Sequence, residues 1–224
     1  MTITRNDLET GRIRKAIIAC GYAPRLLSDQ ELEASITGVL ARHPRGRDVW
    51  LFGYGSLIWN PLVHYTQRRL ATVYGYHRRY CLWSMFGRGT PDAPGMMLGL
   101  DRGGRCQGVA YRLEAAKAVD ELRLLWCREM VTGVYMPRWV RVRDAGEPID
   151  AITFVVDRTH PWYAGKVPLD RIAGAIRQGK GMIGSSADYL RQTCAELVAH
   201  GISDKHLSEV HAAVFGAAPK RKPA

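Results

Sequence analysis

The chain has 224 residues, of which 46% are hydrophobic and 24% charged, and its 32 Lys and Arg against 21 Asp and Glu give a formal net charge of +11. This composition excludes a disordered or collagen-like chain, and this length can bury one core without disulfides or a metal. No apolar run approaches the ~20 residues that a membrane span needs. We therefore expect a cytosolic protein with no membrane association.

The basic residues and the cysteines point to no special partner. The dense basic runs are short, at 12–15, 138–143 and 220–222, and a solvated surface is the simplest interpretation of them. We therefore expect no nucleic-acid partner and no obligate protein partner. Five widely spaced cysteines form no CxxC pair, and no His stands at zinc-ligand spacing from them. The sequence thus predicts reduced thiols and no metal.

The first 47 residues are predicted to be helical. Thr4 can cap a helix that runs to about Cys20, and Ser28 with Glu31 forms a capping box before a second helix. We interpret 1–47 as a helical extension packed on a main domain at 48–216. Residues 217–224 are predicted to be a disordered basic tail.

From Asp48 the pattern changes to short apolar runs and turns. Strands are expected at 49–52, within 70–84, at 96–101, 107–112, 135–142 and 149–157. Arg102-Gly103-Gly104-Arg105 is predicted to be a hairpin turn. Helices are expected at 114–130, 168–178, 185–200 and 203–215, the last capped by Ser203. Strands, one inserted helix, more strands and then helices form an α+β order.

Two glycine strings stand out. Leu51-Phe52-Gly53-Tyr54-Gly55-Ser56-Leu57 follows a strand, but it matches neither a phosphate loop nor a nucleophile elbow. It is either a backbone nest for an anion or a tight structural turn. Gly179 to Gly184 fits GxGxxG but follows a helix, so we expect it to join two helices rather than bind a dinucleotide.

Glu129 occupies an unusual position in the helix expected at 114–130. The apolar positions of this helix form one face, and position 129 continues that face with a carboxylate. Burial raises the pKa of a carboxyl group and suits it to general acid–base catalysis. The alternative is that the helix end emerges into water, where Arg128 or Arg138 pairs with Glu129.

A set of motifs in a fixed order, from about Val49 to Leu197, resembles the ChaC-type, glutathione-specific γ-glutamylcyclotransferases, in their bacterial branch. The resemblance is carried by 49–61 (VWLFGYGSLIWNP), 76–80 (YHRRY), 88–90 (RGT) with 94–95 (PG), 108–112 (GVAYR), 128–130 (REM) with Tyr135 and Pro137, and Tyr189-Leu190. Ser186 stands where the family carries Asn.

This resemblance implies a fold, a reaction and a set of site residues. The fold is a small mixed, partly barrel-like β-sheet surrounded by helices. The reaction cleaves glutathione to 5-oxoproline and Cys-Gly without a metal or organic cofactor, because the α-amine of the substrate is itself the nucleophile. Glu129 is then the general base and acid. Substrate contacts are assigned to Leu51, Phe52, Gly53, Tyr54, Gly55, Ser56, Tyr135 and Tyr189.

Two alternatives remain at this point. One keeps the reaction but acts on other γ-glutamyl amino acids or on γ-glutamylamines. The other is a non-catalytic basic adaptor, linked to cation transport or to nucleic acid, which would bind polyanions in a salt-dependent way.

Overall fold

The computed structural model describes residues 3–20 and 26–216, so the predicted tail at 217–224 lies outside the described residues. The helices are α1 (Arg5–Glu9), α2 (Arg12–Ala19), α3 (Asp29–Leu40), η1 (Ser56–Ile58), α4 (Ala118–Glu129), α5 (Leu169–Gln178), α6 (Ser186–Ala199) and α7 (Lys205–Phe215). The strands are β1 (Val49–Gly53), β2 (Gln67–Ser84), β3 (Gly95–Leu113), β4 (Tyr135–Arg143), β5 (Ile149–Val156), β6 (Lys180–Gly181) and β7 (Gly184–Ser185). The predicted α+β class is confirmed.

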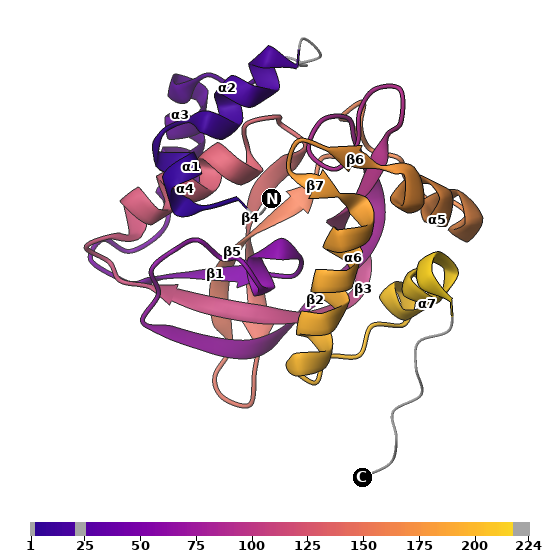
Figure 1. Cartoon of the computed structure of the whole chain (residues 1–224). Helices are drawn as coiled ribbons and strands as arrows, with labels where there is room; N and C mark the ends of the chain where they lie inside the picture. Colours follow the sequence, from indigo (N-terminus) through magenta and orange to yellow (C-terminus); the bar gives the residue numbers. More distant parts are fainter. Residues whose placement is uncertain (1–2, 21–25, 217–224) are drawn as a thin grey trace.

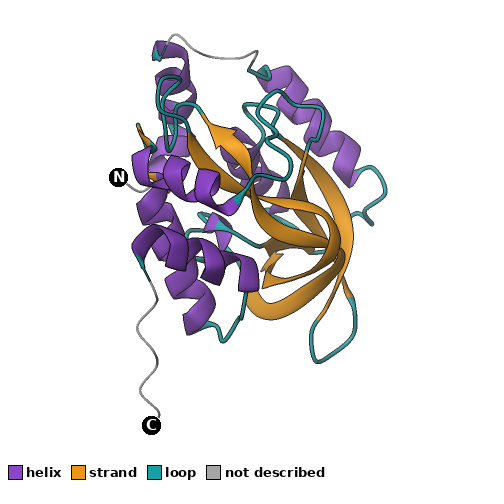
Figure 2. Cartoon of the chain, turned by 90° about the vertical axis from the view of Figure 1, so that its right-hand side faces the viewer, coloured by secondary structure: helices purple, strands orange, loops and turns teal. Residues whose placement is uncertain are grey.

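Five strands close into a barrel in the order β1-β3-β2-β4-β5. All neighbours in this order are antiparallel, and β5 returns to pair with β1 in parallel at Trp50↔Ala151 and Leu51↔Ile152. Closure removes the unpaired sheet edges that would otherwise invite aggregation. Figure 2 shows the long strands bending around one another with helices packed outside them. The barrel is therefore the scaffold on which the loops are held.

The predicted hairpin turn at Arg102–Arg105 is wrong. Residues 95–113 form one long strand, β3, which runs antiparallel to β2 along its whole length. The register shifts between Tyr74 and Tyr76, where Gly75 faces the glycine pair, and Gly103 and Gly104 both have positive φ. The glycines therefore form a bulge, which needs the same backbone freedom as a turn.

The helices form two groups on the barrel (Figure 1). Helices α1 to α3 pack along α4, and α5 to α7 pack together over β3. The capping box at Ser28 is confirmed, and Thr4 caps α1. The predicted first helix is broken, however, because Gly11 adopts a left-handed conformation with φ 64° between α1 and α2. The cap of α7 is Asp204 rather than Ser203, since the Asp204 carboxylate accepts from Leu207 N–H.

Buried side chains pack on both faces of the strands. Leu51 belongs to a large cluster shared with the helices, whereas its neighbour Phe52 packs among residues of the strands and the loop after β1. This alternation is the two-residue period of a strand buried on both faces. In the part of the chain that the structure describes, no helix has the length and apolar character needed to span a membrane.

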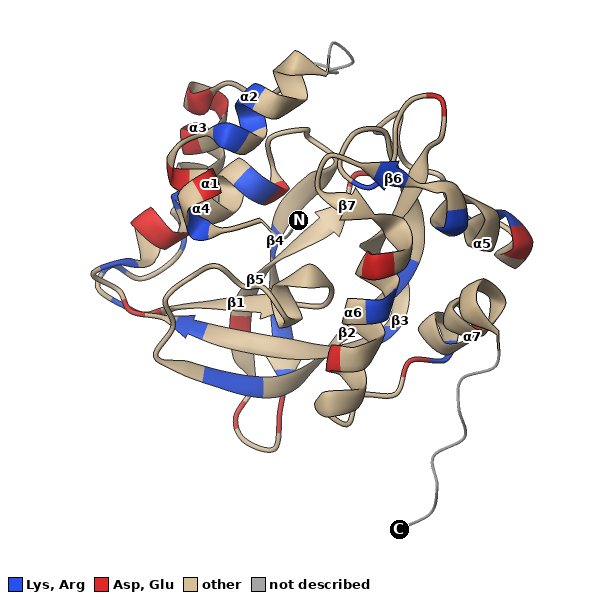
Figure 3. Cartoon of the chain, in the orientation of Figure 1, with Lys and Arg blue, Asp and Glu red and all other residues tan. Residues whose placement is uncertain are grey.

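Basic side chains are spread over helices and strands rather than gathered in one region of the face drawn in Figure 3. Several are paired with acids: Arg69 lies 3.4 Å from Asp144, and Arg141 lies 3.0 Å from Asp150. These exposed pairs fit the solvated basic surface expected from the sequence.

Candidate active site

Glu129 is the last residue of α4, and its side chain lies mostly inside the protein. Leu122, Leu125 and Trp126 on the same helical face are fully buried, whereas the Glu129 side chain is 14% exposed. The helix end therefore does not emerge into water, and the carboxylate stays among apolar neighbours. Burial raises the pKa of Glu129, and the nearby Arg128 partly opposes this rise.

Arg128 contacts Glu129 but does not form an aligned hydrogen bond with its carboxylate. Its Nε lies 3.0 Å from Glu129 Oε1, yet no group in the described chain forms an aligned hydrogen bond with that oxygen. A buried carboxylate oxygen with spare accepting capacity is ready to take a proton from a bound ligand. Arg138, the other partner considered from the sequence, is exposed.

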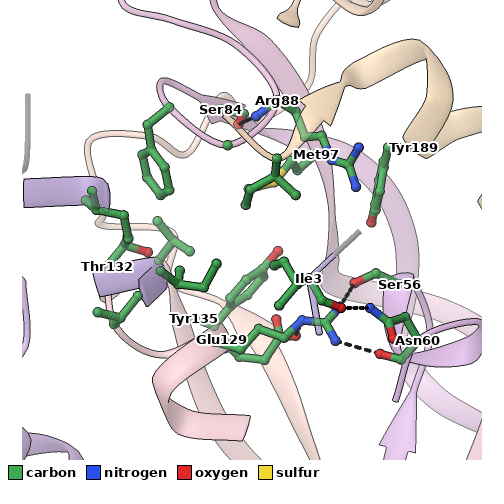
Figure 4. Close-up of a pocket in the computed structure, with 18 of the residues that line it drawn as sticks. Ile3, Ser56, Asn60, Ser84, Arg88, Met97, Glu129, Thr132, Tyr135 and Tyr189 are labelled. Atoms are coloured by element: carbon green, nitrogen blue, oxygen red, sulfur yellow. Dashed lines mark hydrogen bonds and ion pairs between the residues drawn. The ribbon is translucent and has the colours of Figure 1, made fainter. Parts of the chain in front are cut away.

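The remaining guanidinium nitrogens of Arg128 fix the loop after β1. Nη1 donates to Asn60 O over 2.6 Å, and Nη2 donates to Ser56 Oγ over 2.7 Å (Figure 4). Because Ser56 Oγ accepts this bond, its own hydroxyl hydrogen is directed elsewhere. The Asn60 side chain in turn donates to Ile3 O, which links the N-terminal segment to the same network.

Three tyrosines surround Glu129. Tyr135, at the start of β4, donates its hydroxyl to Leu98 O over 2.9 Å. Tyr189, on α6, places its hydroxyl 3.1 Å from the point where a Cβ on Gly55 would stand, so a larger residue there would crowd the hydroxyl. Burial raises the pKa of Tyr189 to about 12 and raises the pKa of Tyr54 and of Tyr135 well above the ordinary value. All three are therefore neutral hydroxyl donors at physiological pH.

Two adjoining cavities meet at Glu129. The inner cavity is lined by Tyr54, Gly55, Ser56, Leu57, Leu98, Glu129, Tyr135, Phe154 and Tyr189. The outer pocket shares Ser56, Glu129, Tyr135 and Tyr189 with it. Counting its open mouth, the outer pocket encloses about 840 Å³ of space between the protein atoms. A ligand that fills both cavities must pass the carboxylate of Glu129.

The outer pocket has a polar side and an apolar wall. Figure 4 shows Arg88 and Ser84 across the pocket from Glu129 and Tyr135. The apolar wall includes Ile3, which precedes α1, and Ile13 and Ile17 from α2, together with Val131 and Trp162. Residues that are far apart in the sequence, from Ile3 to Tyr189, thus contribute to one pocket.

The structure brings most of the predicted site residues together, but not all of them. Tyr54, Gly55, Ser56, Glu129, Tyr135 and Tyr189 line the inner cavity. Leu51, Phe52 and Gly53 line neither cavity. They form the end of β1, where their backbones pair with β3, and Leu51 and Phe52 are fully buried. Their direct contact with substrate therefore stays a prediction, and what the structure adds is their place in the paired strand.

The sequence alone did not indicate that Arg88, Asn60 and the isoleucine wall belong to the pocket. Arg88 was visible only as part of a motif string, and the four-residue spacing of Ile13 and Ile17 indicated a buried helical face without saying what it covers. Only the folded chain brings these side chains into one pocket with Glu129.

Of the other candidates, Cys127 and His64 line neither cavity, and the string at 179–184 contributes only Ile183 to the wall of the outer pocket. Burial raises the pKa of Cys127, which leaves its thiol protonated. His64 pairs with Glu121 over 3.0 Å. The string at 179–184 joins α5 to α6 as expected, and Met182 and Ile183 donate their N–H groups to Phe86 O and Gly87 O. Among the described residues, no group of three His, Cys, Asp or Glu could hold a metal ion.

Comparison with known proteins agrees with these observations. The family described as "ChaC-like protein" matches residues 49–216. The chain belongs to this family. The glutathione-specific gamma-glutamylcyclotransferase of Escherichia coli (strain K12) is 42% identical over 186 residues, which cover 83% of this chain and 80% of that protein. Glutathione-specific gamma-glutamylcyclotransferase 1 of Homo sapiens is 34% identical over 173 residues, covering 74% and 78%.

A solved structure supports the fold separately. The crystal structure of a yeast γ-glutamyl cyclotransferase specific to glutathione matches with a TM-score of 0.68 and 22% identity, over 75% of this chain and 95% of that one. The expected family and the partly barrel-like fold are thus confirmed.

Proposed function

We propose that this protein is a glutathione-specific γ-glutamylcyclotransferase that converts glutathione to 5-oxoproline and Cys-Gly. Its curated relatives carry this activity in their names. The observation that carries the proposal is the buried, incompletely hydrogen-bonded carboxylate of Glu129 at the junction of the two cavities. The inner cavity then takes the γ-glutamyl group, and the outer pocket takes Cys-Gly.

The reaction begins with the α-amine of the substrate. At neutral pH most of this amine is protonated, and Glu129 accepts the proton that must leave. The free amine attacks the γ-carbonyl carbon, and a five-membered ring forms. The cavity contributes by holding the γ-glutamyl chain bent, since well-oriented intramolecular attack can offset ~7–11 kcal/mol of barrier.

The second half of the reaction returns the proton. The γ-carbonyl carbon separates from the cysteinyl nitrogen, and Glu129 delivers its proton to that nitrogen as it departs. The attacking nitrogen loses two protons in all, one before the attack and one as the ring amide forms, and the cysteinyl nitrogen gains two and leaves as an ammonium. Glu129 passes these protons one after the other, as base and then as acid, so protons and electrons balance without a cofactor. The neutral hydroxyls of Ser56, Tyr54 and Tyr189 can donate to the oxygen that gains charge, and a preorganised donor at such an oxygen contributes strongly to catalysis.

The substrate range is tested with a panel assayed by mass spectrometry. Purified full-length protein is incubated with glutathione, γ-glutamylalanine and a γ-glutamylamine, and 5-oxoproline is quantified. We expect the highest kcat/KM with glutathione. A preference for either of the other two would keep the reaction and replace the substrate. No 5-oxoproline from any of the three would overturn the proposal.

A further inference from the structure

Arg88 is a buried cation that forms no salt bridge with the described residues, although Asp188 attracts it from a longer distance. The residue is 7% exposed, and its Nη1 makes a long contact of 3.3 Å with Ser185 O. Its guanidinium lies 5.4 Å from the centre of the Tyr189 ring. Within the described chain, no carboxylate oxygen lies within 4.0 Å of it, whereas buried Arg78 pairs with Asp204 at 3.0 Å. A buried charge that lacks a salt-bridge partner is costly, so the fold maintains it against its own stability.

The backbone that carries Arg88 is held rigidly. Its N–H donates to Ser84 Oγ, and its carbonyl accepts from Ser186 Oγ, both inside the protein. The string at 179–184 closes over this segment. A Cβ at Gly181 would lie 2.3 Å from Phe86 O, and a Cβ at Gly179 would lie 2.7 Å from Arg88 O. The glycines thus allow backbone to pack on backbone, and the GxGxxG string holds Arg88 in position rather than binding a cofactor.

The place of Arg88 in the two cavities indicates what it meets. Arg88 lines the outer pocket but not the inner cavity. Figure 4 shows its guanidinium directed toward Tyr189, across the pocket from Glu129. In the proposed reaction the γ-glutamyl carboxylate stays with the inner cavity. The group that reaches Arg88 therefore belongs to the leaving dipeptide.

We propose that Arg88 binds the terminal carboxylate of the leaving dipeptide, and so selects γ-glutamyl substrates that end in a carboxylate two residues beyond the scissile bond. This assignment rests on the proposed function. A guanidinium matches a carboxylate in planar, two-pronged geometry, which lysine does not reproduce. Arg88 is then a binding residue and leaves the proton transfer at Glu129 unchanged.

The test combines a change of substrate with a change of the residue at position 88. Glutathione and its glycine amide are assayed on wild type, Arg88→Met and Arg88→Lys. Amidation is expected to lower kcat/KM of wild type ~10- to 100-fold, mainly through KM, as expected for loss of a hydrogen bond to a charged group. Arg88→Met is expected to lose as much on glutathione and to show no further loss on amidation. Arg88→Lys is expected to recover only part of the kcat/KM on glutathione that Arg88→Met loses.

Arg171→Met is the matched control. Arg171 also places its guanidinium 5.4 Å from an aromatic ring, that of Trp83, but it is exposed and outside the pocket. This variant is expected to keep the wild-type response to amidation. An amide that wild type accepts as well as glutathione would overturn the assignment even if Arg88→Met fails to fold. Equal amidation losses in wild type and Arg88→Met would overturn it too.

A binding measurement separates this proposal from the proposed function. Calorimetry compares Cys-Gly with cysteinyl-glycinamide on wild type and on Arg88→Met, and needs no turnover. Tighter binding of Cys-Gly to wild type alone supports the carboxylate site even if glutathione is not cleaved. Equal affinities of the two dipeptides for wild type would overturn the site while leaving the reaction standing.

Discussion

At the scale of single residues, we expect Glu129 to determine how kcat/KM falls at low pH. Burial raises the pKa of this carboxyl group, and Arg128 lowers it. The base must be ionised, so we expect kcat/KM to fall as the pH drops through a pKa above the ordinary value for Glu. Replacing Arg128 by Met removes the opposing charge and is expected to move this acid limb of the pH–rate profile to higher pH. A pH–rate profile of both proteins, on the same substrate, checks this.

Two results would contradict that expectation. An acid limb that stays in place in Arg128→Met would mean that Glu129 is not the titrating group. A limb at the ordinary pKa of Glu in wild type would mean that the carboxylate is better solvated than its burial indicates. Circular dichroism of Arg128→Met serves as the control for folding.

The same pKa shift carries a prediction about stability. A carboxyl whose pKa is raised by folding binds its proton more tightly in the folded state, so its contribution to stability is lost as the pH rises through that pKa. Glu129→Gln is neutral at every pH. We therefore expect the variant to gain in Tm relative to wild type on going from pH 4 to pH 7.5. A difference in Tm that does not change with pH would contradict the raised pKa.

At the scale of elements, one partly buried ion pair joins α1 to α4. Arg5 donates to both carboxylate oxygens of Glu121, over 2.7 and 3.1 Å, and the backbone N–H of His64 adds a third bond. Burial alone would raise the pKa of Glu121, but these hydrogen bonds outweigh it and the pKa is lowered. The pair thus holds α1 against the helix that ends in Glu129.

Arg5→Met is expected to lower the free energy of unfolding by ~1.5–3 kcal/mol, because a buried charge loses its charged hydrogen-bond partner. Urea unfolding at pH 7 measures this. Arg123→Met is the control, since Arg123 links the same helix to Glu33 on α3 through an exposed pair of 2.7 Å. That loss should be much smaller, because solvent screens an exposed pair. Equal losses in the two variants would show that α1 is not held by the partly buried pair.

The sequence predicted most elements and their type, but it did not predict how they meet. Apolar periodicity placed β1, α4 and Glu129 correctly because these depend on local pattern. The glycine pair at 103–104 was misread because a bulge and a hairpin turn require the same conformations, and only pairing with β2 distinguishes them. Leu51 to Gly53 shared a string with the cavity-lining Tyr54, so the string alone could not tell paired strand from loop.

At the scale of the whole molecule, the N-terminal helices complete a pocket that the rest of the chain begins. The family match starts at residue 49, yet Ile3, Ile13 and Ile17 line the outer pocket. Ile13→Ala is expected to raise KM for glutathione ~10-fold, with a smaller effect on kcat, because the wall contacts the part of the substrate that does not react.

Leu8→Ala provides the comparison for that variant. Leu8 is 4% exposed and packs in the same cluster as Ile13, but it does not line the pocket. We expect it to lose stability while keeping KM. Steady-state kinetics together with thermal unfolding separate the two effects. A KM that rises equally in both variants would mean that the wall acts through stability alone.

In the proposed intramolecular cyclisation, Glu129 is the residue that moves the proton. The most direct measurement is mass spectrometry of wild type and Glu129→Gln incubated with millimolar glutathione, with folding of both checked by circular dichroism. We predict 5-oxoproline and Cys-Gly in equal amounts from wild type, and a rate lowered ~100- to 10,000-fold in Glu129→Gln. Turnover by a folded Glu129→Gln at near the wild-type rate would contradict the account.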